Sequence, residues 1–312
     1  MTIPSNPLHI IVGDLILDRF VYGETNRIAA EAPILVLDVT SEEEVLGGAY
    51  NVAANLCSLG HMCLFLSVVG ADFRTIEDNP YIGFHALCQT KLYSEQRLTS
   101  KKTRLIANYK RSYLLRVDRE ERIPIERASE DKIISDVKSC IFSVESLIIV
   151  DYKKGVITER LSKELISIAK KHSVPVFVDT KSDRLDQFKG AFLIKPNSYE
   201  FEKIRLRYAP NQSFESACRS TLQQIDLACL VITQGDSGMS LFTDAHGLEE
   251  FPAVPVDNPE LSGAGDCALA AIIYCLASGK ELREACIKAN FAAGRMVAKG
   301  PRYRLLPSDL ET

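Results

Sequence analysis

The chain has 312 residues, and its 37 basic and 41 acidic side chains give a formal net charge of −4 at pH 7. Proteins that hold nucleic-acid phosphates need an excess of positive charge, so this balance argues against a nucleic-acid partner. With 46% hydrophobic and 25% charged residues, the composition is globular and excludes disorder and collagen-like repetition.

No segment has the pattern of a membrane span or of a secretory leader. The longest uncharged apolar run, Cys267 to Ala277, is about half of the ~20 residues that a membrane-spanning helix needs. Met1 to Ile10 has no basic flank, and Asp14 and Asp18 interrupt the first hydrophobic run. We therefore expect a cytoplasmic protein with no membrane partner.

Nine cysteines are scattered along the chain, with no Cys-x-x-Cys pair and no histidine at ligand spacing. In a chain of this length, a disulfide framework is not needed to hold the fold together. The pattern predicts reduced, mostly buried thiols and argues against a structural metal site.

Short β-branched and aliphatic runs alternate with segments of helical spacing. The predicted strands are His9 to Val12, Leu64 to Val69, Ser146 to Val150, Val174 to Val178, Phe192 to Ile194 and Cys229 to Thr233. The predicted helices are Ala49 to Leu59, Glu159 to His172, Phe214 to Ile225, Ala264 to Ala277 and Leu282 to Val297. Continuous apolar strands that alternate with helices predict a doubly wound, mostly parallel α/β sheet flanked by helices.

Two stretches, residues 19–45 and 99–117, do not follow this alternation of strands and helices. They alternate polar and apolar side chains, as strands with one solvent-exposed face do. We expect them to form a small projecting β-sheet, a lid, within one domain that spans residues 1–312. The second stretch is basic, which fits either a solvated edge protected by charge or a surface that faces an anion. The open edges of such a sheet predict a homodimer in which two lids pair.

The strongest motif is Ser262-Gly263-Ala264-Gly265-Asp266, which leads directly into a predicted helix. Small residues let backbone N–H groups approach an anion, and the helix N-terminus adds its positive dipole end. Asp266 in this place can accept the proton of an attacking hydroxyl. The alternative is an ordinary glycine-rich helix entry with an aspartate favoured in the first turn.

A second pattern is Gly47-Gly48, with Asn51 one helical turn later. Paired glycines allow a ligand to approach the backbone, and the Asn51 amide can bond sugar hydroxyls. Glycines before a helix are also common entry-turn residues, so the pattern alone is not specific.

A third pattern, Lys195 to Glu200, follows a predicted strand and places Asn197 and Glu200 in the positions of a capping box. At the carboxyl end of a strand, both side chains are also suited to support a Mg²⁺–phosphate cluster through water. The segment Thr233 to Gly238 reads as a β-turn after a core strand, at a place that suits contact with a nucleotide.

Charged residues recur after predicted strands. They are Asp14 and Asp18, then Asp151 with Lys154, then Asp179 with Lys181. A single carboxylate at a strand end is often only a turn former, but their recurrence indicates a polar crevice at the carboxyl edge of the sheet.

Together and in this order, the motifs resemble those of the ribokinase, or PfkB, family of sugar kinases over essentially the whole chain. Gly47-Gly48 to Asn51, with Gly60 and Gly70, matches the family's N-terminal motif, and Gly263 to Asp266 matches its C-terminal motif. Within the family, several segments resemble bacterial D-glycero-β-D-manno-heptose-7-phosphate kinases, including the kinase half of a bifunctional heptose enzyme. These are Val12-Gly13-Asp14, Leu17-Asp18-Arg19, Tyr22-Gly23, Arg27-Ile28, Glu31-Ala32-Pro33, Asp151-Tyr152, Lys154-Gly155 and Lys195-Pro196-Asn197.

The resemblance implies a ribokinase-like fold and phosphorylation of the anomeric hydroxyl of a heptose 7-phosphate with ATP and Mg²⁺, without a nucleotidyltransferase half in this chain. It makes Asp266 the base and Gly263, Ala264 and Gly265 the anion hole. The implied sugar-binding set is Asp14, Asp18, Gly47, Gly48, Asn51, Arg104, Arg111, Asp151 and Lys154; of these, Arg104, Arg111 or Lys154 would meet the substrate's phosphate, an inference from charge. The implied nucleotide-binding set is Asn197, Glu200, Thr233, Gly235, Gly238, Lys181 and Asn290, with Glu200 also serving Mg²⁺ through water.

The sequence also departs from the family pattern. Tyr50 replaces a small residue, Thr180 a proline, Glu260-Leu261-Ser262 an Asp-x-Thr segment, and Gly300-Pro301-Arg302 a glycine-threonine-serine turn. These changes leave open another acceptor, such as a pentose, a ketohexose phosphate or a nucleoside, and also a non-catalytic relative that binds a sugar or nucleotide. A nicotinamide dehydrogenase is disfavoured, because Gly13-Asp14 stands where Gly-x-Gly-x-x-Gly would follow the first strand.

Overall fold

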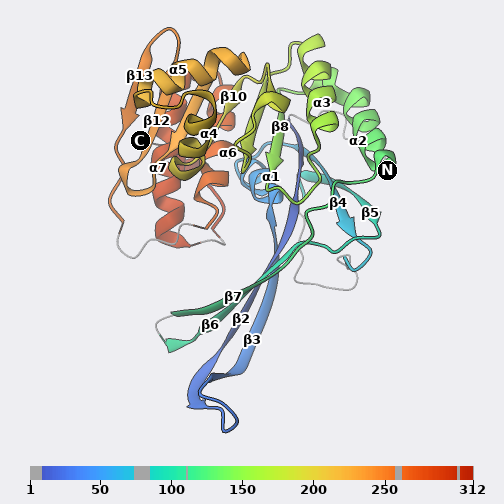
Figure 1. Ribbon diagram of the computed structural model, residues 1–312, viewed down its shortest axis with the longest axis vertical. Helices are drawn as coiled ribbons and strands as arrows, with labels where there is room; N and C mark the ends of the chain where they lie inside the picture. Colours follow the sequence, from blue (N-terminus) through green and yellow to red (C-terminus); the bar gives the residue numbers. More distant parts are fainter. Residues whose placement is uncertain (1–8, 74–84, 110–111, 257–261, 301–302, 312) are drawn as a thin grey trace.

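The computed structural model describes residues 9–73, 85–109, 112–256, 262–300 and 303–311. Figure 1 shows a body in which helices cover a central sheet, with a long β arm that projects from it. Some positions considered above lie outside the described residues: Arg111, the Glu260-Leu261 pair and the Pro301-Arg302 pair.

A nine-stranded sheet forms the centre of the body, in the order β13-β12-β11-β10-β9-β8-β1-β4-β5. Its strands are β1 (His9–Gly13), β4 (Cys63–Gly70), β5 (Cys88–Glu95), β8 (Ser146–Asp151), β9 (Val176–Thr180), β10 (Leu193–Ile194), β11 (Cys229–Thr233), β12 (Met239–Thr243) and β13 (Gly247–Phe251). All pairings from β11 to β5 are parallel, and β12 and β13 add an antiparallel edge. The predicted doubly wound, mostly parallel sheet is confirmed.

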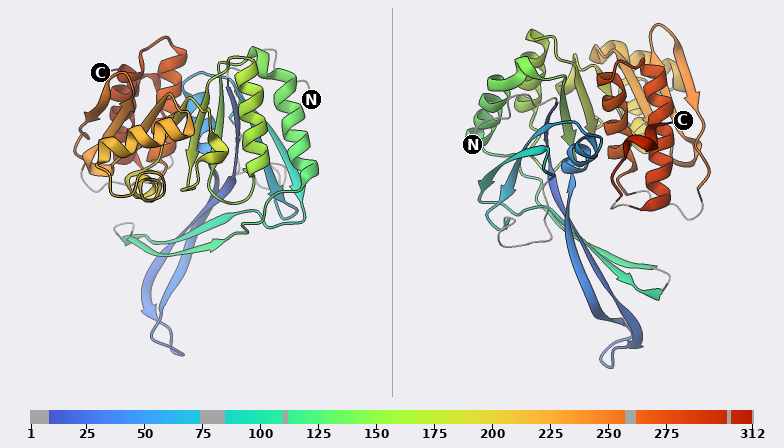
Figure 2. Two further views of the ribbon diagram at one scale, coloured as in Figure 1. Left: turned by 45° about the horizontal axis from the view of Figure 1, so that its top comes forward. Right: turned by 180° about the vertical axis from the view of Figure 1, so that it is seen from behind.

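Two groups of helices cover the two faces of this sheet (Figure 2). One face carries α1 (Ala49–Ser58), α6 (Ala264–Ala277) and α7 (Leu282–Lys299); the other carries α2 (Arg127–Cys140), α3 (Glu159–Lys171), α4 (Ser198–Tyr208) and α5 (Phe214–Ile225). Successive side chains of a strand point to opposite faces. Accordingly, Ile11 of β1 packs in the first core, and its neighbours Ile10 and Val12 pack in the second.

The β arm is a second sheet of four strands in the order β3-β2-β6-β7. Its strands are β2 (Leu15–Ile28), β3 (Leu35–Gly48), β6 (Lys101–Ala107) and β7 (Ser112–Arg119). The predicted projecting sheet is confirmed, but β2 and β3 extend further into the body than predicted. Strand β3 continues directly into α1, so the base of the arm lies at the carboxyl edge of the main sheet.

The described part of the chain contains no helix long and apolar enough to cross a membrane. All nine cysteines are free and buried, as their spacing predicted. They pack as small apolar side chains in the two cores.

Candidate active site

A cavity of about 920 Å³ opens where the β arm meets the carboxyl edge of the main sheet. Its walls come from the arm strands β2 and β6, from the loops after β8, β9, β10 and β11, and from the first turns of α1 and α6. Open α/β sheets bind their ligands at this edge. The cavity is therefore the candidate functional site.

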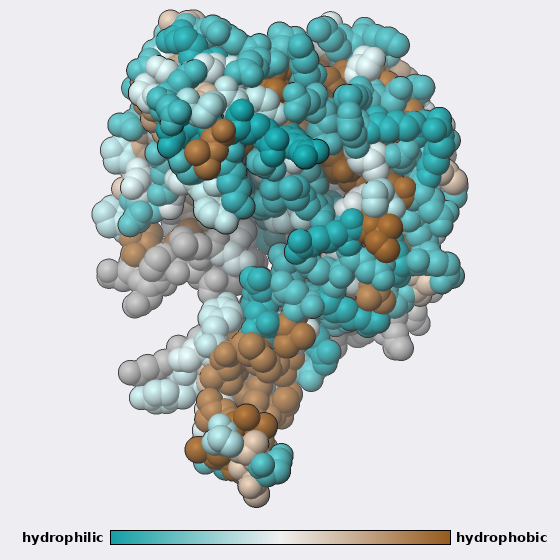
Figure 3. Space-filling model, in the orientation of Figure 1, coloured by the Kyte–Doolittle hydropathy of each residue, from teal (hydrophilic) through white to brown (hydrophobic). Residues whose placement is uncertain are grey.

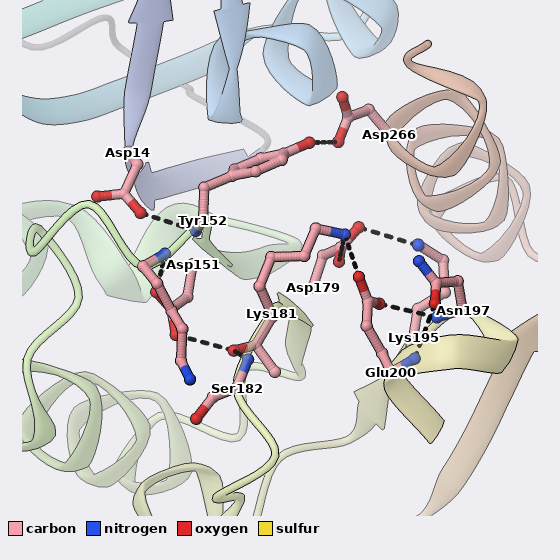
Figure 4. A network of polar contacts seen from close by, with 12 residues as sticks. Asp14, Asp151, Tyr152, Asp179, Lys181, Ser182, Lys195, Asn197, Glu200 and Asp266 are labelled. Atoms are coloured by element: carbon pink, nitrogen blue, oxygen red, sulfur yellow. Dashed lines mark hydrogen bonds and ion pairs between the residues drawn. The ribbon is translucent and has the colours of Figure 1, made fainter. Parts of the chain in front are cut away.

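Asp266 lies in the first turn of α6, at the wall of this cavity, and is only 3% exposed. The preceding entry turn contains Gly263 with a φ of 87°, a left-handed conformation that favours glycine. The carboxylate is held from two sides. Its Oδ1 accepts a hydrogen bond from the Tyr152 hydroxyl at 2.7 Å, and its Oδ2 accepts one from the Asn51 amide at 3.1 Å (Figure 4 draws the first).

The protonation of Asp266 reflects its burial. Burial and, to a smaller extent, the charge of Asp179 raise the pKa of this carboxyl to about 6, although hydrogen bonds from Tyr152 and Asn51 and the charge of Lys195 act in the opposite direction. The group is thus ionised at neutral pH but binds a proton more readily than an exposed aspartate. Such a carboxylate is suited to act as a general base.

A buried ion pair lies next to the entry turn of α6. The Lys195 ammonium is 2.9 Å from Oδ2 of Asp179, and both side chains are almost fully buried. A methyl group added at Gly265 would come within 3.2 Å of the Lys195 nitrogen. Glycine at this position therefore lets a buried cation and the N–H groups of a helix N-terminus face the same space, as an anion site requires.

The loop after β10 forms the next part of the wall and begins α4. Asn197 and Glu200 make the predicted capping box, with each side chain accepting the other's backbone N–H at 2.8 Å. The second carboxylate oxygen of Glu200 pairs with the Lys181 ammonium at 2.6 Å. Both oxygens of Glu200 thus have protein partners, and the described residues contain no cluster of three His, Cys, Asp or Glu side chains that could hold a metal directly.

The end of the cavity beyond β11 is mainly apolar. Thr233, Gly235 and Gly238, from the end of β11 and the turn that follows it, line it on one side. The opposite side is formed by Val254, Val256, Ala293 and Val297. Asn290 also lines this end, and its amide donates to the Pro252 carbonyl at 2.7 Å, which anchors the loop that carries the two valines.

The end at the β arm is polar and basic. Asp18 of β2 and Arg104 of β6 line it and form an ion pair at 2.5 Å. Lys102, also on β6, lines the same end, and its ammonium lies 5.6 Å from the centre of the Tyr152 ring. Gly48 and Asn51 complete this side.

Four residues predicted to bind the sugar do not line the cavity: Asp14, Gly47, Asp151 and Lys154. Asp14 accepts three backbone N–H groups, and Asp151 accepts the Lys153 N–H and the Thr180 hydroxyl. The Lys154 ammonium pairs with Glu120. These side chains have other partners in this structure and are not assigned contacts with a sugar.

Gly47 does not line the cavity itself, but it leaves room for Asp18, which does: a Cβ at Gly47 would lie 2.0 Å from an Asp18 carboxylate oxygen.

Two of the residues that depart from the family pattern, Tyr50 and Thr180, have structural explanations. The Tyr50 ring packs edge-on against Phe65 in the core, away from the cavity wall, and its hydroxyl accepts the His85 N–H. The Thr180 hydroxyl joins the ends of β8 and β9 through Asp151.

The sequence motifs did not single out Tyr152, Asp179, Lys195 or Lys102 as site residues, although all four line the cavity. Tyr152 and Lys195 stood within segments that resemble the heptose kinases, and Asp179 stood among the strand-end carboxylates. Those signals located the residues without indicating what their side chains contact. Lys102 gave no signal beyond the basic character of its strand.

Comparisons with known proteins agree with this geometry. The family model for pfkB family carbohydrate kinases matches residues 10–307. The chain is 37% identical over 294 residues to the Bifunctional protein HldE of a Nitratiruptor species, covering 94% of this chain and 62% of that protein. It is 36% identical over 303 residues to the protein of the same name from Geobacter metallireducens, covering 96% and 61%. The chain thus spans about three fifths of the length of these curated relatives.

Solved structures show the same fold at low sequence identity. Phosphofructokinase-2 from Escherichia coli, crystallised in complex with potassium, matches with a TM-score of 0.75 and 18% identity over 98% of this chain and 97% of that one. Ribokinase from Thermotoga maritima matches with a TM-score of 0.72 and 16% identity over 97% and 98%. The predicted ribokinase-like fold is confirmed. With a family model that covers almost the whole chain, the chain belongs to the pfkB family of carbohydrate kinases, enzymes that transfer a phosphoryl group to a sugar hydroxyl.

Proposed function

We propose that this enzyme transfers the terminal phosphoryl group of ATP to the anomeric hydroxyl of a heptose 7-phosphate. The observation that carries the proposal is the setting of Asp266, a buried carboxylate with raised proton affinity at a glycine turn beside Lys195. The choice of a heptose rests on the resemblance of segments such as Glu31-Ala32-Pro33 and on the similarity to the HldE proteins.

In this reaction, Asp266 takes the proton of the acceptor hydroxyl as the hydroxyl oxygen bonds to phosphorus and the bond to the departing ADP oxygen breaks. Backbone N–H groups of Gly263, Ala264 and Gly265, together with the Lys195 ammonium, offset the negative charge of the transferring group. Asn51 keeps one carboxylate oxygen oriented, as its 3.1 Å hydrogen bond indicates.

The nucleotide fits the opposite part of the cavity. We assign the adenine to the apolar end formed by Val254, Ala293 and Val297, and the phosphates to the side of Lys181. When bound, Mg²⁺ offsets charge on the donor phosphates. Asn197 and Glu200 fit a Mg²⁺ that keeps its water shell, because both Glu200 oxygens already have partners and Mg²⁺ dehydrates reluctantly.

The cation for the phosphate of the acceptor is best supplied by Lys102. Arg104 is already paired with Asp18, and Lys154 with Glu120. Lys102 lines the basic end and has no ion pair among the described residues, only the face of the Tyr152 ring. Lys102 therefore replaces Lys154 in the proposed set.

The acceptor is identified by measuring ADP formation with a heptose 7-phosphate, the same heptose without phosphate, fructose 6-phosphate, ribose and adenosine. We expect the highest kcat/KM with the heptose 7-phosphate. If another acceptor is preferred, the heptose assignment is wrong; if ATP and a sugar bind without ADP formation, the protein is a non-catalytic relative.

A matched pair of lysine variants tests the phosphate contact. We expect Lys102→Met to raise the KM for the heptose 7-phosphate by about tenfold or more, the loss of a charge-assisted contact, with little change for the unphosphorylated sugar. Lys203→Met is the control, because the Lys203 ammonium also lies over a tyrosine ring but on the exposed surface of α4. If Lys102→Met raises the KM for the phosphorylated and the unphosphorylated sugar by the same factor, the proposed contact is refuted.

We also propose that two copies of the chain pair through their β arms. Large apolar side chains of the arm are exposed to solvent: Ile28, Leu35, Val39, Leu115 and Val117 are 50% to 64% exposed. Figure 3 shows an apolar surface along the projecting arm that contrasts with the polar body. A contiguous apolar surface of this kind on a sheet with open edges is covered most simply by a second copy.

A further inference from the structure

We propose that Tyr152 is a positioning residue that fixes the reactive orientation of Asp266, and that Asp14 holds Tyr152 in place through the backbone of its loop. The proposal rests on the proposed role of Asp266 as the base. It gives Asp14 a different task from the sugar contact that its position after β1 suggested.

The first observation is the way the Asp266 carboxylate is held. Tyr152, in the loop after β8, donates its hydroxyl to Oδ1, and Asn51, in α1, donates its amide to Oδ2. The two donors come from different elements and act on different oxygens. Rotation of the carboxylate would break both hydrogen bonds, so the direction in which its remaining lone pairs face the cavity is set by the protein.

The second observation is the position of the Tyr152 ring. Its centre lies 5.6 Å from the ammonium of Lys102, which comes from the β arm, and 5.3 Å from that of Lys181, which follows β9. Ammonium groups at this distance from an aromatic ring attract it. The ring is therefore within reach of one cation from the β arm and one from the loop after β9, and its hydroxyl is directed at Asp266 (Figure 4).

The third observation is the support of the loop that carries Tyr152. Oδ2 of Asp14 accepts the N–H of Tyr152 at 2.7 Å and that of Lys154 at 3.1 Å, and Oδ1 accepts the N–H of Val156 at 3.0 Å. Asp14 is 1% exposed and does not line the cavity. Its carboxylate therefore acts on the site through the loop backbone.

The path of this loop is further restricted at Gly155. This residue has a φ of 95°, and a Cβ there would lie 1.9 Å from the Ile123 carbonyl oxygen. Only glycine fits this conformation and this spacing. In the conformation that this glycine permits, all three N–H groups reach Asp14 and the Tyr152 hydroxyl reaches the base.

Removal of the Tyr152 hydroxyl has a chemical consequence as well as a geometric one. A donor to a carboxylate stabilises its ionised form, so loss of this hydroxyl lets Asp266 bind its proton more tightly. The other charged groups that act on Asp266 stay in place. They are Asp179, Lys195, Lys181 and Arg304.

The variant Tyr152→Phe tests this role in the enzyme. We expect kcat to fall by about tenfold or more, as for a misplaced catalytic group, with the KM for ATP unchanged within about twofold. The acid limb of the kcat profile should move to higher pH. Tyr208→Phe is the control. Like Tyr152, Tyr208 donates its hydroxyl to a carboxylate, that of Asp186, but it lies at the end of α4 and does not line the cavity. An unchanged kcat and pH profile for Tyr152→Phe would overturn the proposal.

A second measurement needs no turnover and therefore separates this proposal from the proposed function. The titration of Asp266 is followed by NMR in protein labelled with carbon-13 at aspartate carboxyls, with the signal assigned through Asp266→Asn. We expect a higher midpoint in Tyr152→Phe than in the wild type. If the wild type forms no ADP with any acceptor, the function fails, but a raised midpoint still supports the contact and an unchanged midpoint refutes it.

The variant Asp14→Asn tests whether Asp14 holds the loop that carries Tyr152. An amide has one acceptor oxygen where the carboxylate has two, so the three N–H groups cannot all keep their partner. We expect a folded Asp14→Asn protein to show the same upward shift of the Asp266 midpoint as Tyr152→Phe. A folded variant with a wild-type midpoint would remove Asp14 from the proposal, and if the variant does not fold, Tyr152→Phe alone decides.

Discussion

The ammonium of Lys195 lies 2.9 Å from Oδ2 of Asp179, and neither side chain has appreciable contact with solvent. Burial alone would raise the pKa of Asp179, but the charges of Lys195 and Lys181 hold it below its usual value. Removing Lys195 leaves the buried Asp179 carboxylate with only the more distant Lys181 ammonium, at 3.8 Å, and breaking such a buried pair costs about 3–5 kcal/mol. We expect Lys195→Met to lose unfolding free energy of this size in denaturant unfolding, and Asp179→Asn combined with Lys195→Met to recover part of it.

Turnover separates the structural role of this pair from its role in catalysis. The double variant restores the charge balance of the core but still lacks the cation beside Gly265, so we expect it to remain slow. Full turnover in a stable double variant would contradict the catalytic role of Lys195. A double variant as unstable as Lys195→Met would contradict the pairing itself.

The pH dependence of turnover follows from the state of Asp266. Its pKa is raised to about 6, chiefly by burial, and the ionised form is the one that accepts a proton. We expect kcat/KM to be constant near neutral pH and to fall as the pH drops through about 6, approaching about tenfold per pH unit below it. Initial rates across this range, with saturating ATP, measure the limb; activity that stays constant well below pH 6 would exclude this carboxyl as the base.

The stability of the fold is also expected to depend on acid pH, through His9. This residue begins β1, at the end of the strand away from the active site. Burial, with a contribution from His61, lowers the pKa of His9 from 6.5 to about 3. The folded state thus keeps His9 neutral where the unfolded state takes up a proton. The stabilisation is complete above pH 6.5 and is lost progressively as the pH falls from 6.5 towards 3.

The stability prediction is tested by the difference between wild type and His9→Gln. Asp14 and Asp266 work in the opposite direction, because their raised pKa values make the folded state bind protons first, and the subtraction cancels their effect. We expect the wild type to lose more unfolding free energy than His9→Gln between neutral and mildly acidic pH. The exposed His246→Gln is the control. Parallel curves for wild type and His9→Gln would exclude this source of acid sensitivity.

Pairing through the β arm predicts a specific effect of surface charge. Leu115 on β7 is 58% exposed, and Leu206 on α4 is 61% exposed. A charge in an apolar interface costs free energy, while a charge on open surface costs little. We expect a dimer in sedimentation of the wild type and of Leu206→Glu, and a monomer for Leu115→Glu. A monomeric wild type at micromolar concentration would rule out the pairing.

The sequence predicted the main sheet because buried parallel strands form continuous apolar runs and their helices have clear periodicity. The five predicted helices end within two residues of α1, α3, α5, α6 and α7. Helix α2 and strands β5 and β13 were missed, and α4 was indicated only by the capping box at its start. Helix α2 buries only part of a strongly polar segment, and β5 is an edge strand with polar side chains, so neither has the apolar pattern that marks an element in the core.

The candidate site was predicted unevenly, for a physical reason. Gly263 to Asp266 form a local turn, and local turn chemistry can be read from neighbouring residues. The hydrogen bond between Tyr152 and Asp266 joins residues 114 positions apart, and no local pattern reveals it. Asp14 shows the same limit, because its place after a strand was predicted but the direction of its carboxylate, towards the loop backbone, depends on packing.

The most direct test is ADP formation by Asp266→Asn with ATP and a heptose 7-phosphate at neutral pH. The asparagine keeps the shape of the side chain but cannot accept the hydroxyl proton, so we expect kcat to fall by about 10²–10⁴-fold. ATP binding and thermal stability should stay close to the wild type. A stable Asp266→Asn enzyme that turns over at the wild-type rate would contradict the account.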